Sequence, residues 1–316
     1  MTDAIGGYFG LELRQGEHYH PNALRLNTGR NCFEYILRAR GYKHVWLPYY
    51  TCEVLLEPLQ KLNVSYSFYA INESLEPVAL PTLQKKDEAI LYTNYFGLKQ
   101  NVVELLAAKY GKQLIVDNAQ AFFAPHIDGI DTFYTARKFF GVPDGAYLYT
   151  DAPLGRDLPQ DNSLERMSHL LKRTDKGAES GFADYQQHEK ELCNQPIQRM
   201  SNLTEKLLCS IDYQSIAQIR RTNYRTIERS LQATNRLKVS LPNDAVPMVY
   251  PYWCEAGNTL RPLLQAQRIY IATYWPNVQE WNAPNLERQL VTNLLPLPID
   301  QRYNDNDIEK LKNLIL

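Results

Sequence analysis

Between Leu24 and Tyr149, short apolar runs alternate with stretches in which apolar residues recur every three or four positions. The short runs are typical of buried strands and the longer stretches of amphipathic helices. Strands are predicted at 24–27, 44–48, 64–69, 89–93, 114–116, 132–134 and 146–149. Helices are predicted to begin at 28–31 and to cover 53–62 and 102–110. This alternation predicts an α/β fold, a three-layer α/β/α large domain with a mostly parallel sheet.

The pattern changes after Asp151. Polar residues dominate 152–182, which predicts a loop or lid with one helix near 164–172. A charged, periodic stretch then predicts two long amphipathic helices between 183 and 231. The remaining predictions are strands at 246–252 and 269–275 and helices at 259–267, 286–295 and 305–316. The expected domains are a large domain (1–190), a helical connector (191–235) and a small C-terminal α/β domain (236–316).

Polar residues stand where several of the predicted strands end. Asp117 and Gln120 follow the strand at 114–116, and Lys138 follows the strand at 132–134. In parallel sheets the ligand sits at the carboxyl ends of the strands. An acid and a lysine at neighbouring strand ends suit a pyridoxal phosphate site, because the lysine can form a Schiff base and the carboxylate can hold the pyridine nitrogen protonated.

Each of these residues also has a simpler interpretation. Asp117 can cap a loop, and Lys138 can be a surface lysine beside Arg137. The two phenylalanines after Lys138 place it at the edge of buried sequence, which weakens the second interpretation. Thr28 and Gly29 open a helix, and free N–H groups at a helix start bind anions, although an ordinary capped helix fits the same residues.

Composition limits the classes of function. The 316 residues are 44% apolar and carry a net charge of −1, so no global field favours nucleic acid or a membrane surface. No run approaches the roughly 18 apolar residues of a membrane span, and the first seven residues lack the pattern of a signal peptide. The five cysteines show no paired spacing and no metal-ligand cluster, which predicts reduced thiols in a cytoplasmic protein without a metal.

Taken together, these motifs resemble the DegT/StrS-type sugar aminotransferases, pyridoxal phosphate enzymes of the aspartate aminotransferase fold. Four stretches carry the resemblance: the small-Gly-small turn at 28–31, the P-x-x-T segment at 48–52, the acid-x-Ala-Gln strand end at 117–120, and the lysine with its following turn and strand at 138–151. In the last stretch, Lys138 leads to Asp144-Gly145-Ala146 and to a strand ending in Thr-Asp.

The resemblance implies roles for individual residues. Lys138 is expected to form the Schiff base and then to act as general base and acid, and Asp117 is expected to pair with the pyridine nitrogen. The further cofactor-binding residues that it implies are Thr28, Gly29, Arg30 and Thr135 toward the phosphate, Gln120 near the phenolic oxygen, and Tyr50 against the ring.

The resemblance also implies a reaction and partners. It predicts transfer of an amino group from an amino acid, with glutamate expected, to a nucleotide-linked keto-sugar, as in polysaccharide biosynthesis. A homodimer is implied, because enzymes of this fold build each site from two subunits. The chain departs from the family pattern at Cys52, where an aromatic usually stacks on the ring, and at 160–185, where a cross-dimer segment is replaced. Two alternatives therefore stay open: a dehydratase or lyase, and a non-catalytic partner subunit of the same fold.

Overall fold

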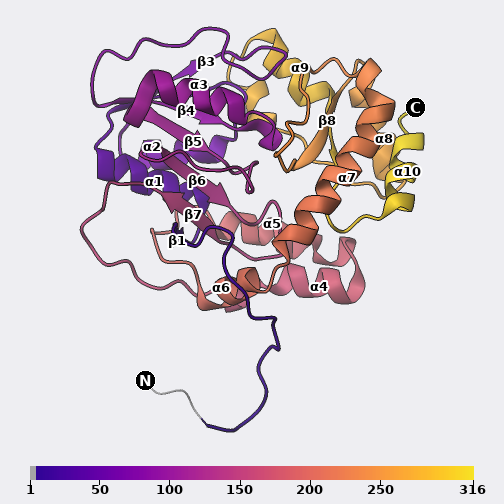
Figure 1. Ribbon diagram of the computed structural model, residues 1–316, viewed down its shortest axis with the longest axis horizontal. Helices are drawn as coiled ribbons and strands as arrows, with labels where there is room; N and C mark the ends of the chain where they lie inside the picture. Colours follow the sequence, from indigo (N-terminus) through magenta and orange to yellow (C-terminus); the bar gives the residue numbers. More distant parts are fainter. Residues whose placement is uncertain (1–4) are drawn as a thin grey trace.

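The computed structural model describes residues 5–316 (Figure 1). Residues 1–4 lie outside the described part. They belong to the first seven residues, for which the sequence predicts no signal peptide. A seven-stranded sheet organises the chain, with the strands in the order β1-β7-β6-β5-β4-β2-β3. Their bounds are β1 Leu24–Leu26, β2 His44–Pro48, β3 Ser65–Tyr69, β4 Glu88–Thr93, β5 Leu114–Asp117, β6 Asp131–Thr135 and β7 Ala146–Tyr149.

The sheet is mostly parallel, as the sequence predicts. Each neighbouring pair from β6 through β5, β4 and β2 to β3 is parallel, and only β7 runs antiparallel to both of its neighbours. The carboxyl ends of β4, β5 and β6 therefore meet at one edge of the sheet. At that edge Thr93 is in register with Asp117, and Asp117 with Phe133.

Hydrophobic cores form on both faces of the sheet. Within β5, Leu114 and Val116 belong to one core, whereas Ile115 belongs to the other. The core with Ile115 is covered by α1 (Gly29–Arg40) and α2 (Leu56–Lys61), and the opposite core by α3 (Gln100–Tyr110) and α7 (Tyr213–Leu231). Because successive strand residues point to opposite faces, this alternation confirms the three-layer α/β/α arrangement.

The helix predicted after Thr28 is α1. The Thr28 hydroxyl accepts a hydrogen bond from the N–H of Asn31 at 3.1 Å and caps the helix. The helix ends at Gly41, whose φ of 69° lies in the left-handed region that favours glycine. Since Thr28 follows β1 closely, the positive end of α1 lies at the same sheet edge as the carboxyl ends of β4, β5 and β6.

Three helices, not two, follow the lid segment. They are α5 (Phe182–Glu191), α6 (Asn202–Cys209) and α7, and they are preceded by α4 (Ser168–Lys176). The prediction of two long helices is wrong because the chain leaves the helical conformation at Asn194, which has a φ of 57°, and Pro196 cannot continue a helix. Ser201 then caps α6 by accepting from the N–H of Thr204.

The C-terminal part contains β8 (Val249–Trp253), β9 (Leu294–Pro298), α8 (Gly257–Ala266), α9 (Asn285–Asn293) and α10 (Asp305–Asn313). The strand predicted at 269–275 is wrong: that segment is irregular, and Tyr270 in its middle is 52% exposed. The strand that pairs with β8 is β9, at 294–298, where the predicted helix at 286–295 ends too late. A two-stranded sheet consists of edge strands only, so the prolines of β9 are tolerated and Pro296 pairs with Pro251.

Short 3₁₀ helices complete the chain, at Glu53–Leu55, Tyr95–Gly97, Gly111–Gln113, Leu164–Arg166, Glu179–Gly181, Gln232–Thr234 and Pro276–Gln279. One buried cluster runs from Ala23 through β4, β5 and α7 to Leu311 in α10, so the C-terminal elements share a core with the large sheet. In Figure 1 the orange helix α7 lies between the sheet and the helices α8 and α10. Among residues 5–316, no helix is both long and apolar enough to span a membrane.

Candidate active site

A cavity of about 170 Å³ lies at the carboxyl edge of the sheet. The ends of β4, β5 and β6 and the start of α1 contribute to its wall. It is lined by Thr28, Gly29, Arg30, Thr51, Cys52, Val54, Leu55, Thr93, Asp117, Ala119, Gln120, Phe133, Thr135, Arg137, Lys138, Glu189, Leu192 and Trp275. Seven of the eight predicted site residues are in this set, so the fold brings together side chains that are far apart in the sequence.

Asp117 is the last residue of β5 and is 6% exposed. Its carboxylate accepts a hydrogen bond from the N–H of Ala119 at 2.8 Å. Burial raises the pKa of Asp117, while the positive charge of Lys138 and the bond from the N–H of Ala119 oppose that rise. Within residues 5–316 this carboxylate forms no ion pair closer than 4 Å. Its negative charge therefore faces the cavity without a paired cation.

Lys138 lies in the turn after β6, and its side chain is exposed into the cavity. The following residue, Phe139, is buried and anchors the turn. The carbonyl of Phe139 accepts from the side-chain amide of Gln301 at 2.7 Å and from Arg220 at 3.4 Å. The backbone beside Lys138 is therefore fixed while its amine remains unpaired, since no carboxylate in the described part of the chain lies within 4 Å of it.

Buried hydrogen bonds and close packing fix the turn that follows, at Asp144 and Gly145. Asp144 is fully buried and accepts from Thr204 at 2.5 Å and from Ser163 at 2.6 Å. Arg166 lies 2.8 Å from the same carboxylate. Gly145 has a φ of 107°, and a Cβ there would come within 2.8 Å of Thr204. The turn between Lys138 and β7 is thus held in one conformation against α6.

The start of α1 forms another part of the cavity wall. Gly29 lies beside Phe133 and Thr135, and the first turn of the helix supplies backbone N–H groups there. Arg30 also lines the cavity, but its guanidinium donates to Glu57 at 2.9 Å and to the carbonyl of Leu192 at 3.0 Å. Its charge is largely compensated, so the free N–H groups at the helix start are better placed than Arg30 to accept an anion.

Two polar atoms of the cavity wall lack partners. Gln120 accepts from the N–H of Phe96 at 3.0 Å, but its Nε2 is buried without a hydrogen-bond partner. The hydroxyl of Thr93 is buried without a partner in the same way. A buried donor without a partner is costly, so both atoms indicate that a polar ligand completes the site.

The predicted role of Tyr50 against the ring is not borne out by the cavity lining. The ring of Tyr50 does not line the cavity: it is fully buried and packs on Tyr95 and Trp275, at centroid distances of 5.9 and 4.9 Å. Cys52 lines it instead, and burial raises the pKa of its thiol. Trp275, a buried residue of the hydrophobic core, is also part of the wall.

Sequence reasoning missed the contribution of α5. Glu189 lines the cavity and pairs with Arg137, and Leu192 closes the wall next to Arg30. In the sequence these residues belong to a charged amphipathic stretch, whose polar face normally contacts solvent. No local signal identifies them, because their contacts are with residues more than 50 positions earlier.

The residues present fit pyridoxal phosphate. That cofactor combines a cationic ring nitrogen, an aldehyde and a phosphate; here an uncompensated carboxylate, an unpaired lysine and a helix start share one cavity. The volume suits a single ring, since a cavity of ~150 Å³ accepts benzene. Among residues 5–316, no group of three or more His, Cys, Asp or Glu side chains is arranged to hold a metal ion.

Comparison with known proteins identifies the fold. No protein-family model and no curated protein matches the sequence. Solved structures do match: a DegT/DnrJ/EryC1/StrS aminotransferase from Brucella abortus superposes with a TM-score of 0.61 at 15% identity, covering 93% of this chain and 84% of that one. At such low identity the likeness shows the fold alone, and the predicted aspartate aminotransferase-type fold of the DegT/StrS proteins is confirmed.

Two further structures illustrate what proteins of this fold bind. DesV from S. venezuelae, solved in complex with a ketimine intermediate, gives a TM-score of 0.60 at 16% identity, covering 93% of this chain and 83% of that one. NtdA from Bacillus subtilis, solved with the bound cofactor PMP, gives 0.65 at 13% identity, covering 93% and 72%.

Proposed function

We propose that this chain is a pyridoxal phosphate-dependent aminotransferase that moves an amino group from an amino acid, with glutamate as the expected donor, to a nucleotide-linked keto-sugar. The observation that carries the proposal is the single cavity in which Asp117, Lys138 and the start of α1 meet. The structural neighbours support the reaction class, because two of them are described with an amino form or an amino-transfer intermediate of the cofactor.

The chain's own residues have distinct tasks in this reaction. Lys138 would hold the cofactor and, once free, move a proton at the carbon that carries the amino group. Asp117 holds the proton on the ring nitrogen, and the helix start at Gly29 binds the phosphate. When bound, the cofactor supplies an electron sink for that carbon. Cys52 and Trp275 close the cavity wall around the ring.

Two alternatives involve the same fold. In the family's sugar dehydratases a histidine replaces the lysine, so Lys138 favours amino transfer over dehydration. A non-catalytic partner subunit is the other alternative, and Cys52 and the unusual 160–185 segment are its motivation. The unpaired atoms of Gln120 and Thr93 favour a ligand-binding site over an inert one.

A homodimer is part of the proposal. The N-terminal arm exposes Ile5, Tyr8, Phe9 and Leu11 almost completely, at 104, 99, 91 and 72%. Phe182, at the start of α5, is also 57% exposed. Apolar side chains left open in this way are typical of surfaces that a second subunit covers. We place the activity in the cytoplasm, because all five cysteines are free thiols in the structure.

The test is amino transfer itself. The purified protein is incubated with pyridoxal phosphate, freed of excess cofactor and mixed with glutamate, while the visible absorbance of the bound cofactor is followed. The proposal predicts loss of the visible band with glutamate and its return when a nucleotide-linked keto-sugar is added. A protein that holds the cofactor but shows no spectral change with any amino acid would be a different kind of pyridoxal phosphate protein.

A further inference from the structure

Arg220 is a buried cation on α7 that contacts the turn carrying Lys138. Its side chain is 1% exposed, and among residues 5–316 no carboxylate lies within 4 Å of it. Its Nε is buried without a hydrogen-bond partner. Burial lowers the pKa of Arg220 to about 10, so the side chain is still positively charged at neutral pH. A buried cation without a carboxylate is costly, and the contacts that it does form must offset that cost.

Two separate segments share the guanidinium group of Arg220. One terminal nitrogen donates to the carbonyls of Met248 at 2.9 Å and Pro247 at 3.3 Å, in the segment that leads into β8. The other donates to the carbonyl of Phe139 at 3.4 Å, and the guanidinium carbon lies 4.7 Å from the centroid of the Phe139 ring. Phe139 directly follows Lys138. The planar fork of an arginine can join two carbonyls of different segments at once.

The segment before β8 continues this contact to another wall of the cofactor cavity. The N–H of Met248 donates to the carbonyl of Phe96 at 2.9 Å, and the N–H of Phe96 donates to Oε1 of Gln120 at 3.0 Å. Phe96 has a φ of 58°, which a phenylalanine rarely adopts, so bonds on both sides of this residue are needed to hold it. Because Gln120 lines the cavity, Arg220 connects the Lys138 turn to the Gln120 wall.

A second residue of α7 fixes the segment after β9. Asn223 lies one turn after Arg220 on the same face of the helix. Its side-chain amide donates to the carbonyls of Ile299 at 3.1 Å and Tyr303 at 3.3 Å. Both ends of the segment 299–303 are therefore attached to α7.

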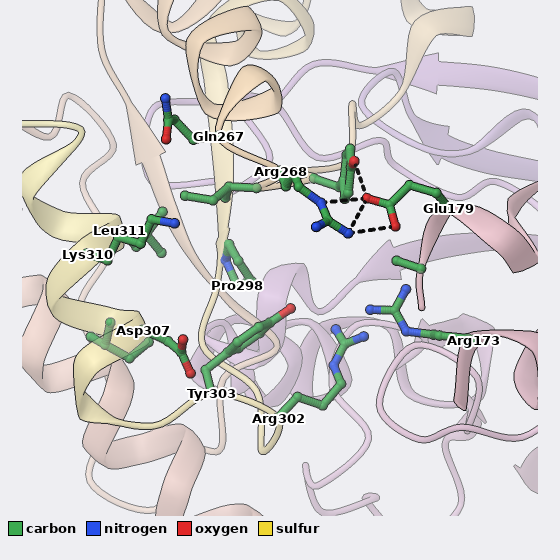
Figure 2. Close-up of a pocket in the computed structure, with 14 residues that line it drawn as sticks. Arg173, Glu179, Gln267, Arg268, Pro298, Arg302, Tyr303, Asp307, Lys310 and Leu311 are labelled. Carbon is green, nitrogen blue, oxygen red and sulfur yellow. Dashed lines mark hydrogen bonds and ion pairs between the residues drawn. The ribbon is translucent and has the colours of Figure 1, made fainter. Parts of the chain in front are cut away.

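Gln301, in the middle of that segment, also holds the Lys138 turn. Its side-chain amide donates to the carbonyl of Phe139 at 2.7 Å. The next two side chains, Arg302 and Tyr303, point into a separate cavity of about 480 Å³, which Gln301 does not line (Figure 2). The carbonyl of Phe139 thus receives two donors, one from α7 itself and one from a segment that α7 fixes.

These contacts matter for Lys138 because its own side chain has no other support. The side chain is exposed into the cofactor cavity, and its stem is long and flexible. Within the turn, the N–H groups of Phe139 and Phe140 both donate to the carbonyl of Ala136 at 3.0 Å. These local bonds shape the turn, and the carbonyl of Phe139 is the point at which Arg220 attaches it to α7.

From this arrangement we infer that Arg220 is a positioning residue for Lys138: it holds the lysine turn at a fixed distance from the Gln120 wall, so that the amine enters the cofactor cavity in one position. Arg220 does not line that cavity and acts only through the residues that do. The inference rests on the proposed function for the identity of the group that the amine meets. A displacement of about 1 Å at a reacting group can cost roughly 10²-fold in rate.

Arg220→Met tests the inference, because methionine is unbranched and apolar and lacks the donors. The cofactor-loaded protein is mixed with glutamate, and the loss of the visible band is followed. The rate at saturating glutamate should fall at least about tenfold, while the half-saturating concentration stays within about threefold. General loosening of the fold would change both quantities. Arg220→Lys keeps the charge but not the fork, and its rate should lie between those of the wild type and Arg220→Met.

The neighbouring arginine provides a matched control. Arg221 donates to the carbonyls of Ala245 at 3.0 Å and Asp244 at 2.9 Å, close to the segment that Arg220 holds, but not to Phe139. Arg221→Met should therefore keep the wild-type rate. Equal rates in Arg220→Met and Arg221→Met would overturn the inference.

A second variant covers the case in which Arg220→Met does not fold. Gln301→Leu removes the other donor to the carbonyl of Phe139 without removing a charge, and it should lower the saturating rate in the same direction. Urea unfolding shows which variants are folded. Wild-type rates in both Gln301→Leu and Arg220→Lys would contradict a role for these contacts in placing Lys138.

Hydrogen exchange of the cofactor-free protein separates this inference from the proposed function. Amides of the peptide that contains residues 139–142 should exchange faster in Arg220→Met than in Arg221→Met. If the wild type stays colourless with pyridoxal phosphate but the exchange depends on Arg220, the fixed turn is supported and the aminotransferase proposal is contradicted. If Arg220→Met transfers amino groups and exchanges amides as the wild type does, the inference fails and the aminotransferase proposal stands.

Discussion

Replacing Asp117 by asparagine removes the negative charge of the side chain and keeps its shape. The carboxylate is 6% exposed, and its one backbone bond, from Ala119 at 2.8 Å, can be kept by the asparagine oxygen. The backbone and the neighbouring Thr93 should therefore stay in place. The substitution removes only the negative charge that faces the ring nitrogen of the cofactor. A neutral amide does not stabilise the protonated form of that nitrogen.

The expected loss is large for catalysis and small for folding. Removing one preorganised electrostatic contact to a reacting group typically lowers turnover by roughly 10²–10³-fold, about 3–4 kcal/mol. We expect a loss of that size in amino transfer from glutamate, with cofactor still bound but more weakly.

The cofactor-free protein should not be destabilised. Burial raises the pKa of Asp117 above its unfolded value, so between the two pKa values the folded chain binds more protons than the unfolded chain. Stability from this group therefore falls as the pH rises through the folded-state pKa. At neutral pH, Asp117→Asn removes that penalty and should leave the free energy of unfolding equal or higher.

Three measurements check the reasoning. They are the rate of the spectral change with glutamate, the dissociation constant of the cofactor, and urea unfolding of the cofactor-free protein. Asp128→Asn is the matched control, because the side chain of Asp128 is 101% exposed. Unchanged turnover in Asp117→Asn would remove Asp117 from the ring nitrogen and refute the assignment.

Two further predictions concern stability. Asp144→Ala should lower the free energy of unfolding by about 3–5 kcal/mol, because two buried hydroxyls lose their acceptor and the largely buried Arg166 keeps only one carboxylate partner, Asp161. A loss below about 1 kcal/mol in urea unfolding would show that these contacts do not hold the turn. Burial lowers the pKa of His20 to about 4. As the pH falls from about 6.5 to about 4, His20 therefore becomes protonated in the unfolded chain but stays neutral in the folded chain. Stability should fall over that range, and His20→Gln should recover up to about 3 kcal/mol at pH 4; parallel pH profiles would contradict this.

The sheet and the centre of the site were predictable from the sequence because their signals are local. Buried strands such as β5 are apolar up to their last residue, and the polar residue that ends the strand, here Asp117, marks the ligand edge. The order of strands and helices then places Asp117, Lys138 and Thr28 at one edge without knowledge of any side-chain contact.

The failures have long-range causes. The aromatic and β-branched residues of 269–275 have high strand propensity, but β8 pairs with the proline-containing β9 instead. Arg30 lines the cavity as predicted, but its ion pair with Glu57, 27 residues away, has no signal in the sequence. Glu189 belongs to a charged helix whose sequence does not show that one turn closes the cavity.

The central claim is that Lys138 holds pyridoxal phosphate in the cavity that it shares with Asp117. Borohydride reduction of the cofactor-loaded protein, followed by peptide mass spectrometry, tests it most directly. We predict loss of the visible absorbance and one reduced cofactor attached to the peptide that contains Lys138, whereas Lys138→Ala should show neither. A colourless protein, or a label spread over other lysines, would contradict the claim.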